Sequence, residues 1–104
     1  MSHIEWITAI DEGAIEWSVH ALKTMFERDI SREAVKHIIR TGEVIEAYPE
    51  DKPYPSQLIL GFWLNKPLHA VTAYNTSGKK LYIITAYEPD EKHFEAGWKV
   101  RRTK

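Results

Sequence analysis

The sequence predicts an α+β domain in which helices cover one face of an antiparallel sheet. Apolar residues recur at helical spacing up to residue 41, and from residue 43 to residue 87 they alternate or run continuously as in strands. Helices followed by consecutive strands favour an antiparallel meander. The length of 104 residues is typical of one domain, so we expect a single domain over 1–104. The expected architecture is two to three helices packed on a four-stranded antiparallel sheet.

Two helices are predicted before residue 30. The first covers Ile4–Ile10, where isoleucine recurs at every third position, and it ends before Gly13. The second begins at Ser18, a favourable N-cap residue, and continues to about Arg28. At about 100° per residue, its apolar side chains gather on one face. We expect that face to hold Val19, Leu22, Met25 and Phe26.

A third helix and four strands follow. Ser31 is the expected N-cap of a helix over Arg32–Thr41, which Gly42 ends. Its buried stripe is expected to be Ala34, Val35, Ile38 and Ile39. The strands are predicted at Glu43–Tyr48, Gln57–Leu64, Leu68–Tyr74 and Leu81–Tyr87. Three of the five prolines lie between the first two strands, and a turn separates each later pair.

Composition excludes several kinds of site. The chain has no cysteine, which excludes disulfides, thiolate zinc sites, iron–sulfur clusters and a cysteine nucleophile. The five histidines are scattered, and no phosphate loop or dinucleotide fingerprint is present, so we expect neither a metal nor a cofactor. No apolar run approaches the length of a membrane span, and the first residues carry acids where a signal peptide would be basic. We therefore expect a cytoplasmic protein that does not bind membranes.

Charge is unevenly distributed along the chain. The formal net charge is −1, but four of the 14 basic residues lie in residues 98–104, which contain no acid. The first 97 residues therefore carry 10 basic and 15 acidic side chains. This distribution lacks the general basic surface of a nucleic-acid-binding protein. Any contact with a polyanion is expected at the C-terminal segment, whose candidate RNA-binding residues are Trp98, Lys99, Arg101 and Arg102.

One group of residues is suited to phosphodiester chemistry. His20, Lys23 and Arg28 lie on the polar side of the second predicted helix, and Tyr87 ends the last predicted strand. Metal-independent RNA cleavage requires proton transfer at two oxygens and cations that stabilise charge on the phosphoryl group. Histidine can transfer protons near neutral pH, and arginine binds phosphate bidentately. A solvated helix face, with Glu27 paired to Lys23, is the alternative interpretation. His69 is interpreted as a hydrogen-bonded histidine of the core or sheet edge.

A family resemblance extends over most of the chain. The residues that carry it are Ser18–Ala21, Met25, Arg28, Ile30, Ser31, Gly42–Ile45, Tyr48, Pro55, Leu58, Leu60, Pro67–His69, Ile84–Asp90 and Trp98–Arg102. They resemble a small prokaryotic family, the domain of unknown function 4258. The family often has arginine directly before the methionine, where this chain has Thr24, with Lys23 one residue earlier.

The resemblance implies a fold and a function. It places the chain near the barnase–EndoU–colicin–RelE group of ribonucleases, with helices followed by an antiparallel sheet. It implies a metal-independent endoribonuclease, the toxin of a type II toxin–antitoxin system, acting on single-stranded or ribosome-bound RNA. It further implies a zinc-finger antitoxin of the MqsA type as partner. The residues that match its motifs are His20, Arg28, His69, Tyr87, Arg101 and Arg102.

Two functions are therefore expected. In the first, an endoribonuclease, His20 transfers a proton, Arg28 and Lys23 stabilise the phosphate, and Tyr87 stacks on a base or assists. The second is a non-catalytic module of the same fold that binds a protein or RNA. The acidic body and Thr24 favour the module.

Overall fold

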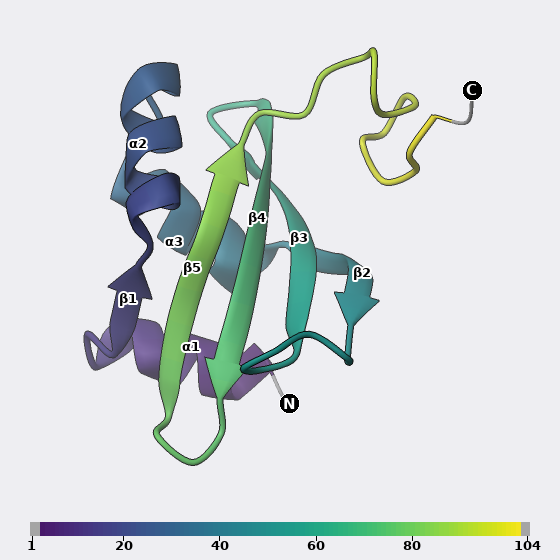
Figure 1. The fold of residues 1–104 in the computed structure, drawn as a ribbon. Helices are drawn as coiled ribbons and strands as arrows, with labels where there is room; N and C mark the ends of the chain where they lie inside the picture. The colour runs from purple at the N-terminus through teal and green to yellow at the C-terminus, as the bar shows by residue number, and fades with distance from the viewer. Residues whose placement is uncertain (1–2, 103–104) are drawn as a thin grey trace.

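The computed structural model describes residues 3–102 and contains the expected order of helices and strands. Lys104, the last residue of the basic C-terminus, lies outside the described residues. The helices are α1 (His3–Asp11), α2 (Val19–Arg28) and α3 (Arg32–Thr41). The strands are β1 (Ile15–Trp17), β2 (Glu43–Tyr48), β3 (Ser56–Trp63), β4 (Lys66–Asn75) and β5 (Lys80–Tyr87). The α+β fold class is therefore confirmed (Figure 1).

The sheet corrects one part of the prediction. It has five strands in the order β1-β5-β4-β3-β2, and it is mixed rather than fully antiparallel. Strands β2 to β5 form the expected antiparallel meander, and β1 pairs in parallel with β5 at the edge. β1 is only three residues long, so its sequence shows no alternation. Its backbone groups find partners on β5 because the chain passes that edge between two helices.

The N-terminal ends of α2 and α3 form as the sequence predicts. Ser18 and Ser31 are N-caps, and their hydroxyl oxygens accept hydrogen bonds from the backbone N–H groups of Ala21 and Ala34. Gly42 is the C-cap of α3. The prediction of both helix starts from a serine followed by an apolar stripe is confirmed.

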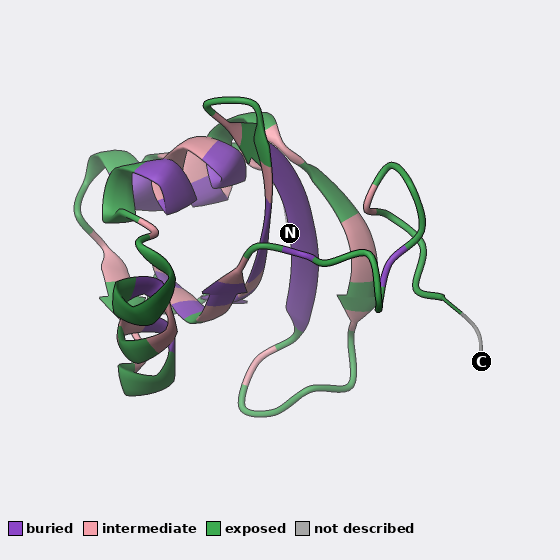
Figure 2. Cartoon of the chain, turned by 90° about the horizontal axis from the view of Figure 1, so that it is seen from above, coloured by how far each residue is buried: buried purple, intermediate pink, exposed green. Residues whose placement is uncertain are grey.

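The helices lie on one side of the sheet (Figure 2). Helix α3 packs on β3 and β4, α2 packs on β5, and α1 contacts α3 and β5. The expected stripe of α3 is fully buried, together with Ile59 of β3 and Ile83 of β5. Gly61 allows the close contact of α3 with β3, because a Cβ there would lie 2.5 Å from the Cβ of Ile38.

Helix α2 is rotated from its predicted orientation. Ala21 and Met25 are buried, whereas Val19 and Phe26, expected in the apolar face, are 84% and 89% exposed. The side chain of Ala21 is small and permits a close approach of α2 to β5, which positions the larger apolar residues away from the sheet. The prediction of this helix face is confirmed for Met25 and is wrong for Val19 and Phe26, which form part of the molecular surface.

The opposite side of the sheet, here called the open face, carries a different set of side chains. Leu68 and Ala70 belong to the helix-covered core, so His69 between them lies on the open face. Strand register places Tyr87 and Leu60 directly beside His69 on the neighbouring strands. The segment after β5, residues 88–102, passes the sheet near the beginning of β4 (Figure 1).

Candidate functional site

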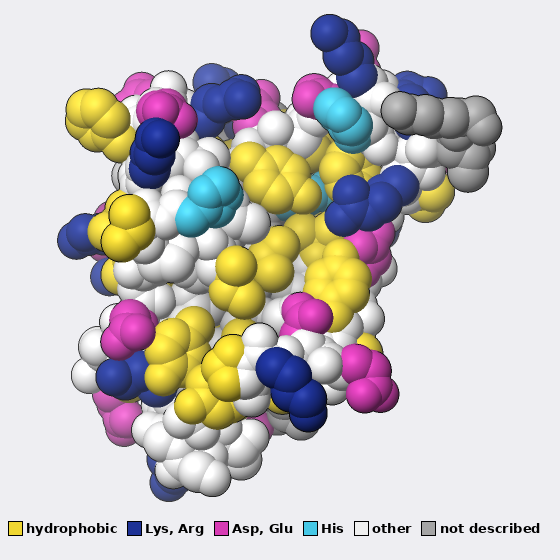
Figure 3. Space-filling model, viewed as in Figure 1, with side chains coloured by type: hydrophobic (Ala, Val, Ile, Leu, Met, Phe, Trp, Pro, Cys, Tyr) yellow, Lys and Arg dark blue, Asp and Glu magenta, His cyan; other side chains and the backbone are white. Residues whose placement is uncertain are grey.

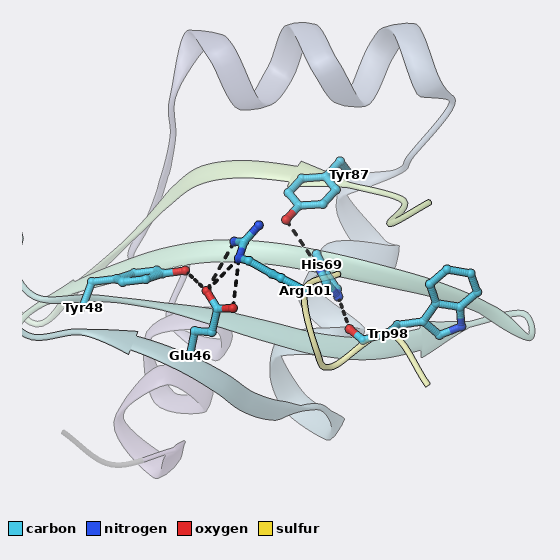
Figure 4. Close-up of polar contacts among 6 residues, drawn as sticks. All are labelled: Glu46, Tyr48, His69, Tyr87, Trp98 and Arg101. Carbon is cyan, nitrogen blue, oxygen red and sulfur yellow. Dashed lines mark hydrogen bonds and ion pairs between the residues drawn. The ribbon is translucent and has the colours of Figure 1, made fainter. Parts of the chain in front are cut away.

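His69 is the centre of a polar cluster on the open face. Its side chain is fully buried, and both ring nitrogens are hydrogen-bonded. Nδ1 lies 3.2 Å from the hydroxyl oxygen of Tyr87, and Nε2 lies 2.7 Å from the carbonyl oxygen of Trp98. The ring of Phe94 packs edge-on against the imidazole, with centroids 4.5 Å apart. The interpretation of His69 as a hydrogen-bonded histidine is confirmed, and its partners are Tyr87 and the C-terminal segment (Figure 4).

Arg101 holds the second half of this cluster. Its guanidinium donates hydrogen bonds to Glu46 of β2, with Nε 3.0 Å from Oε2, and it lies over the ring of Phe94. Tyr48 donates a hydrogen bond to the same carboxylate. The cluster of Glu46, Tyr48, His69, Tyr87 and Arg101 therefore joins β2, β4, β5 and the C-terminal segment.

Burial and neighbouring charge shift the titration of these groups. Burial lowers the pKa of His69, and Arg101 lowers it further, whereas the hydrogen bond to the Trp98 carbonyl and the charge of Glu46 oppose the shift. Burial also raises the pKa of Tyr87. For Glu46, burial acts to raise the pKa, but hydrogen bonds from Tyr48 and Arg101 outweigh it and hold the pKa below its usual value. At neutral pH His69 is therefore an uncharged imidazole between a phenol and an ion pair.

A pocket of about 260 Å³ opens beside this cluster. It is lined by Arg28, Tyr87, Glu88, Pro89, Asp90, His93, Phe94 and Arg101. Its walls come from the end of α2, the end of β5 and the C-terminal segment. We call this space the Tyr87 pocket. Figure 3 views this side of the molecule, where histidine and Lys or Arg side chains border hydrophobic ones.

The Tyr87 pocket contains both signs of charge. Asp90 is paired with His93, Nδ1 to Oδ1 2.7 Å, and Arg101 is paired with Glu46. Arg28 is exposed and, within residues 3–102, makes no hydrogen bond or ion pair. Its guanidinium is thus free to bind an anionic ligand, next to a phenol and a second guanidinium.

Not all of the predicted catalytic residues meet in this pocket. Arg28 and Tyr87 line it together, whereas His20 and Lys23 of α2 are not among its lining residues. His20 lies eight residues before Arg28, which corresponds to about 12 Å along a helix. Both His20 and Lys23 are exposed, with no hydrogen bond or ion pair to the described part of the chain.

The predicted RNA-binding residues of the C-terminal segment mostly contact the protein itself. Arg101 pairs with Glu46, Lys99 pairs with Glu43 at 2.8 Å, and Arg102 donates to the carbonyl of Glu91. The carbonyl of Trp98 binds His69. The acidic edge strand β2 therefore neutralises two of the four basic residues that the sequence offers to a polyanion.

Comparison with known proteins identifies the family. A family model described as a domain of unknown function, DUF4258, matches residues 17–88, which is more than half of the chain. The chain belongs to this family. The DUF4258 match includes Arg28, Glu46, His69 and Tyr87 and ends before the segment that supplies Phe94 and Arg101. Searches of curated proteins and of solved structures found no match.

The structure adds residues to the site that sequence reasoning did not select. Glu46, Tyr48 and His93 are not among the predicted site residues. His69 matches a motif of the resembled family, but the sequence alone favours a structural role for it. The strand register of β4 and β5, which places His69 opposite Tyr87, is the signal that reveals it. For His93, the acid three residues earlier, Asp90, is a signal visible in the sequence.

Two further searches concern metals and membranes. Within residues 3–102, no group of three or more His, Asp or Glu side chains is arranged to hold a metal ion. None of the helices in the same described range is both long and apolar enough to cross a membrane.

Proposed function

We propose that the protein is a cytoplasmic endoribonuclease that cleaves RNA without a metal ion and serves as the toxin of a type II toxin–antitoxin pair. One observation carries the proposal: Arg28, Tyr87 and Arg101, from three separate parts of the chain, line the same pocket. A phenol and two guanidiniums in one pocket provide a proton-transfer group and positive charge for a phosphodiester. The resemblance to the barnase–EndoU–colicin–RelE group supports the same reaction.

The residues have distinct roles in this reaction. Arg28, whose guanidinium has no partner among residues 3–102, binds the phosphoryl oxygens and stabilises the charge that develops on them. Arg101 contributes a second positive charge, reduced by its pair with Glu46. Tyr87 takes the proton of the ribose 2′-hydroxyl, whose oxygen attacks phosphorus. The bond from phosphorus to the 5′-oxygen breaks, that oxygen takes a proton from water, and a 2′,3′-cyclic phosphate remains. His20 and Lys23, exposed on α2, remain candidate contacts to the RNA beyond the pocket.

The charge of the pocket restricts the RNA that it accepts. Glu88 and Asp90 border the pocket and disfavour a densely charged duplex, whereas a single strand presents one phosphate at a time. Single-stranded or ribosome-bound RNA is therefore the proposed substrate. A zinc-finger antitoxin of the MqsA type is the proposed partner. Of the four predicted RNA-binding residues, Arg101 lines the pocket that this partner would cover.

The test is cleavage of a single-stranded RNA by the purified chain in the presence of a chelator. We expect products with 2′,3′-cyclic phosphate ends. Arg28→Ala and Tyr87→Phe should each reduce the rate by about 10²-fold or more, because each removes one group that acts in the transition state. Arg40→Ala is the matched control: Arg40 pairs with Asp11 away from the pocket, and its loss should leave the rate unchanged. His20→Ala should have a smaller effect than Arg28→Ala.

Intact RNA, or cleavage that Arg28→Ala and Tyr87→Phe leave unchanged, would contradict the proposal. In that case the second function, a non-catalytic interaction module, is favoured. It has its own supporting observation, since α2 leaves Val19 and Phe26 exposed and β2 neutralises Lys99 and Arg101. The two functions also differ in cells, because only the ribonuclease should arrest growth when it is expressed without a partner.

A further inference from the structure

The hydrogen bonds of His69 determine where its proton lies. A backbone carbonyl can only accept, so the 2.7 Å contact with the Trp98 carbonyl requires a proton on Nε2. In a neutral imidazole, Nδ1 then carries the lone pair and must accept from its partner. That partner is the hydroxyl of Tyr87, 3.2 Å away, which therefore donates its proton to Nδ1.

The same geometry determines how Tyr87 faces the pocket. The phenol proton points toward buried His69, while Tyr87 itself lines the pocket. Its oxygen therefore keeps lone pairs that can accept a further hydrogen bond, either from Arg101, which acts on this phenol, or from a ligand in the pocket. A group held in this way accepts a hydrogen bond from a ligand hydroxyl better than it donates one.

The surroundings of His69 favour an imidazole that can receive a proton. The groups that face it are the Tyr87 hydroxyl from β5, Glu46 from β2, and the Trp98 carbonyl, the Phe94 ring and Arg101 from the C-terminal segment. Burial and Arg101 keep the ring neutral, whereas Glu46 and the Trp98 carbonyl stabilise the imidazolium once it forms. The imidazole is thus neutral at rest and has two acceptors for positive charge beside it.

We propose that His69 is a positioning residue that acts through Tyr87 and receives the proton that Tyr87 transfers during RNA cleavage. The inference rests on the proposed ribonuclease function. As the 2′-hydroxyl proton moves to the Tyr87 oxygen, the phenol proton moves to Nδ1 of His69. The 2′-oxygen forms its bond to phosphorus, the bond from phosphorus to the 5′-oxygen breaks, and the 5′-oxygen takes a proton from water. His69 then returns its proton to solvent through Tyr87.

His69→Gln separates this role from a structural one. A glutamine amide can donate to the Trp98 carbonyl and accept from Tyr87, but it cannot take up a proton. We expect the variant to fold, and we expect its rate of RNA cleavage at neutral pH to be lower than that of the wild type by about 10²-fold or more. His37→Gln is the control, because His37 of α3 packs on Trp63 of β3 and does not line the Tyr87 pocket.

The dependence of kcat/KM on pH gives the second readout. In the wild-type chain the rate should rise with pH through the pKa of His69, which lies below its usual value near 6.5, and then level off. In His69→Gln this acid limb should disappear, and the residual rate should rise toward the high pKa of Tyr87. His93, paired with Asp90, lines the same pocket, but the substitution changes only His69.

The outcomes distinguish the relay from the function on which it rests. Wild-type protein that leaves RNA intact overturns both proposals. An active wild type with an active His69→Gln variant and an unchanged pH profile overturns only the relay. Nitrogen NMR of the wild-type imidazole tests the relay independently of activity and of the variant's folding: protonation at Nε2 supports it, and protonation at Nδ1 overturns it.

Discussion

The two faces of the sheet are built from different chemistry. The helix-covered face is closed by apolar contacts of α3 with β3 and β4 and of α2 with β5, and its core includes Ile38, Ile59 and Ile83. The open face carries Glu46 and His69, whose burial depends on specific hydrogen bonds and on the segment after β5. Apolar packing is stable over a wide range of pH, whereas the polar cluster depends on the protonation of its members. The comparison therefore separates what holds the fold together from what can carry chemistry.

The largest expected effect comes from the helix-covered face. Ile38→Ala should lower the free energy of unfolding by about 2–5 kcal/mol, because it removes buried methylene groups and leaves a cavity. Phe26→Ala is the control: Phe26 is larger but 89% exposed, and its loss should change stability by about 0.5 kcal/mol or less. Denaturant unfolding measures both. Equal effects of the two variants would show that α2 buries Phe26, as the sequence pattern alone suggests.

The next effect comes from the open face and depends on pH. The pKa of His69 is lower in the folded chain than in the unfolded chain, so the folded state binds the proton less well. Its contribution to stability is fully present above the unfolded pKa of about 6.5 and is lost as the pH falls through the folded pKa. Each unit by which the pKa is lowered corresponds to about 1.4 kcal/mol.

Unfolding measured across this pH range checks the prediction. The free energy of unfolding should decline on acidification below about pH 6.5 in the wild type, and His69→Gln should remove that part of the decline. Glu46 contributes in a separate window: its pKa is lowered below 4.5, so its contribution is lost only as the pH falls through that lower value. A wild-type stability that stays constant down to pH 5 would mean that His69 is not buried as a neutral ring.

The helix-covered face was largely predictable from the sequence. Ser18 and Ser31 indicated two helix starts, and the β-branched and aromatic residues of 81–87 indicated a strand of the sheet. β1 was missed because three residues show no period. The predicted orientation of α2 was wrong because the spacing of its apolar residues does not reveal that the small Ala21 is buried against the sheet.

The open face was less predictable for a physical reason. Arg28 and Tyr87 were selected by residue type, and both line the pocket. The proximity of His69 to Glu46 instead depends on the pairing register of the strands. β-Bulges shift this register between Val44 and Glu46 in β2 and between Val71 and Thr72 in β4. A shift of one residue turns a side chain to the other face, so alternation alone cannot position these groups.

The smallest effects distinguish the two ion pairs that attach the C-terminal segment to β2. Arg101→Ala should lower the free energy of unfolding by about 1 kcal/mol, because it leaves the mostly buried carboxylate of Glu46 without its guanidinium partner. Lys99→Ala should change it by about 0.5 kcal/mol or less, because Lys99 and Glu43 are both more than half exposed and solvent screens their attraction. Unfolding at low and high salt measures both variants, and only the small effect of Lys99→Ala should vanish at high salt. Equal losses for the two variants would indicate that the segment is held by charge alone, without the polar cluster of the open face.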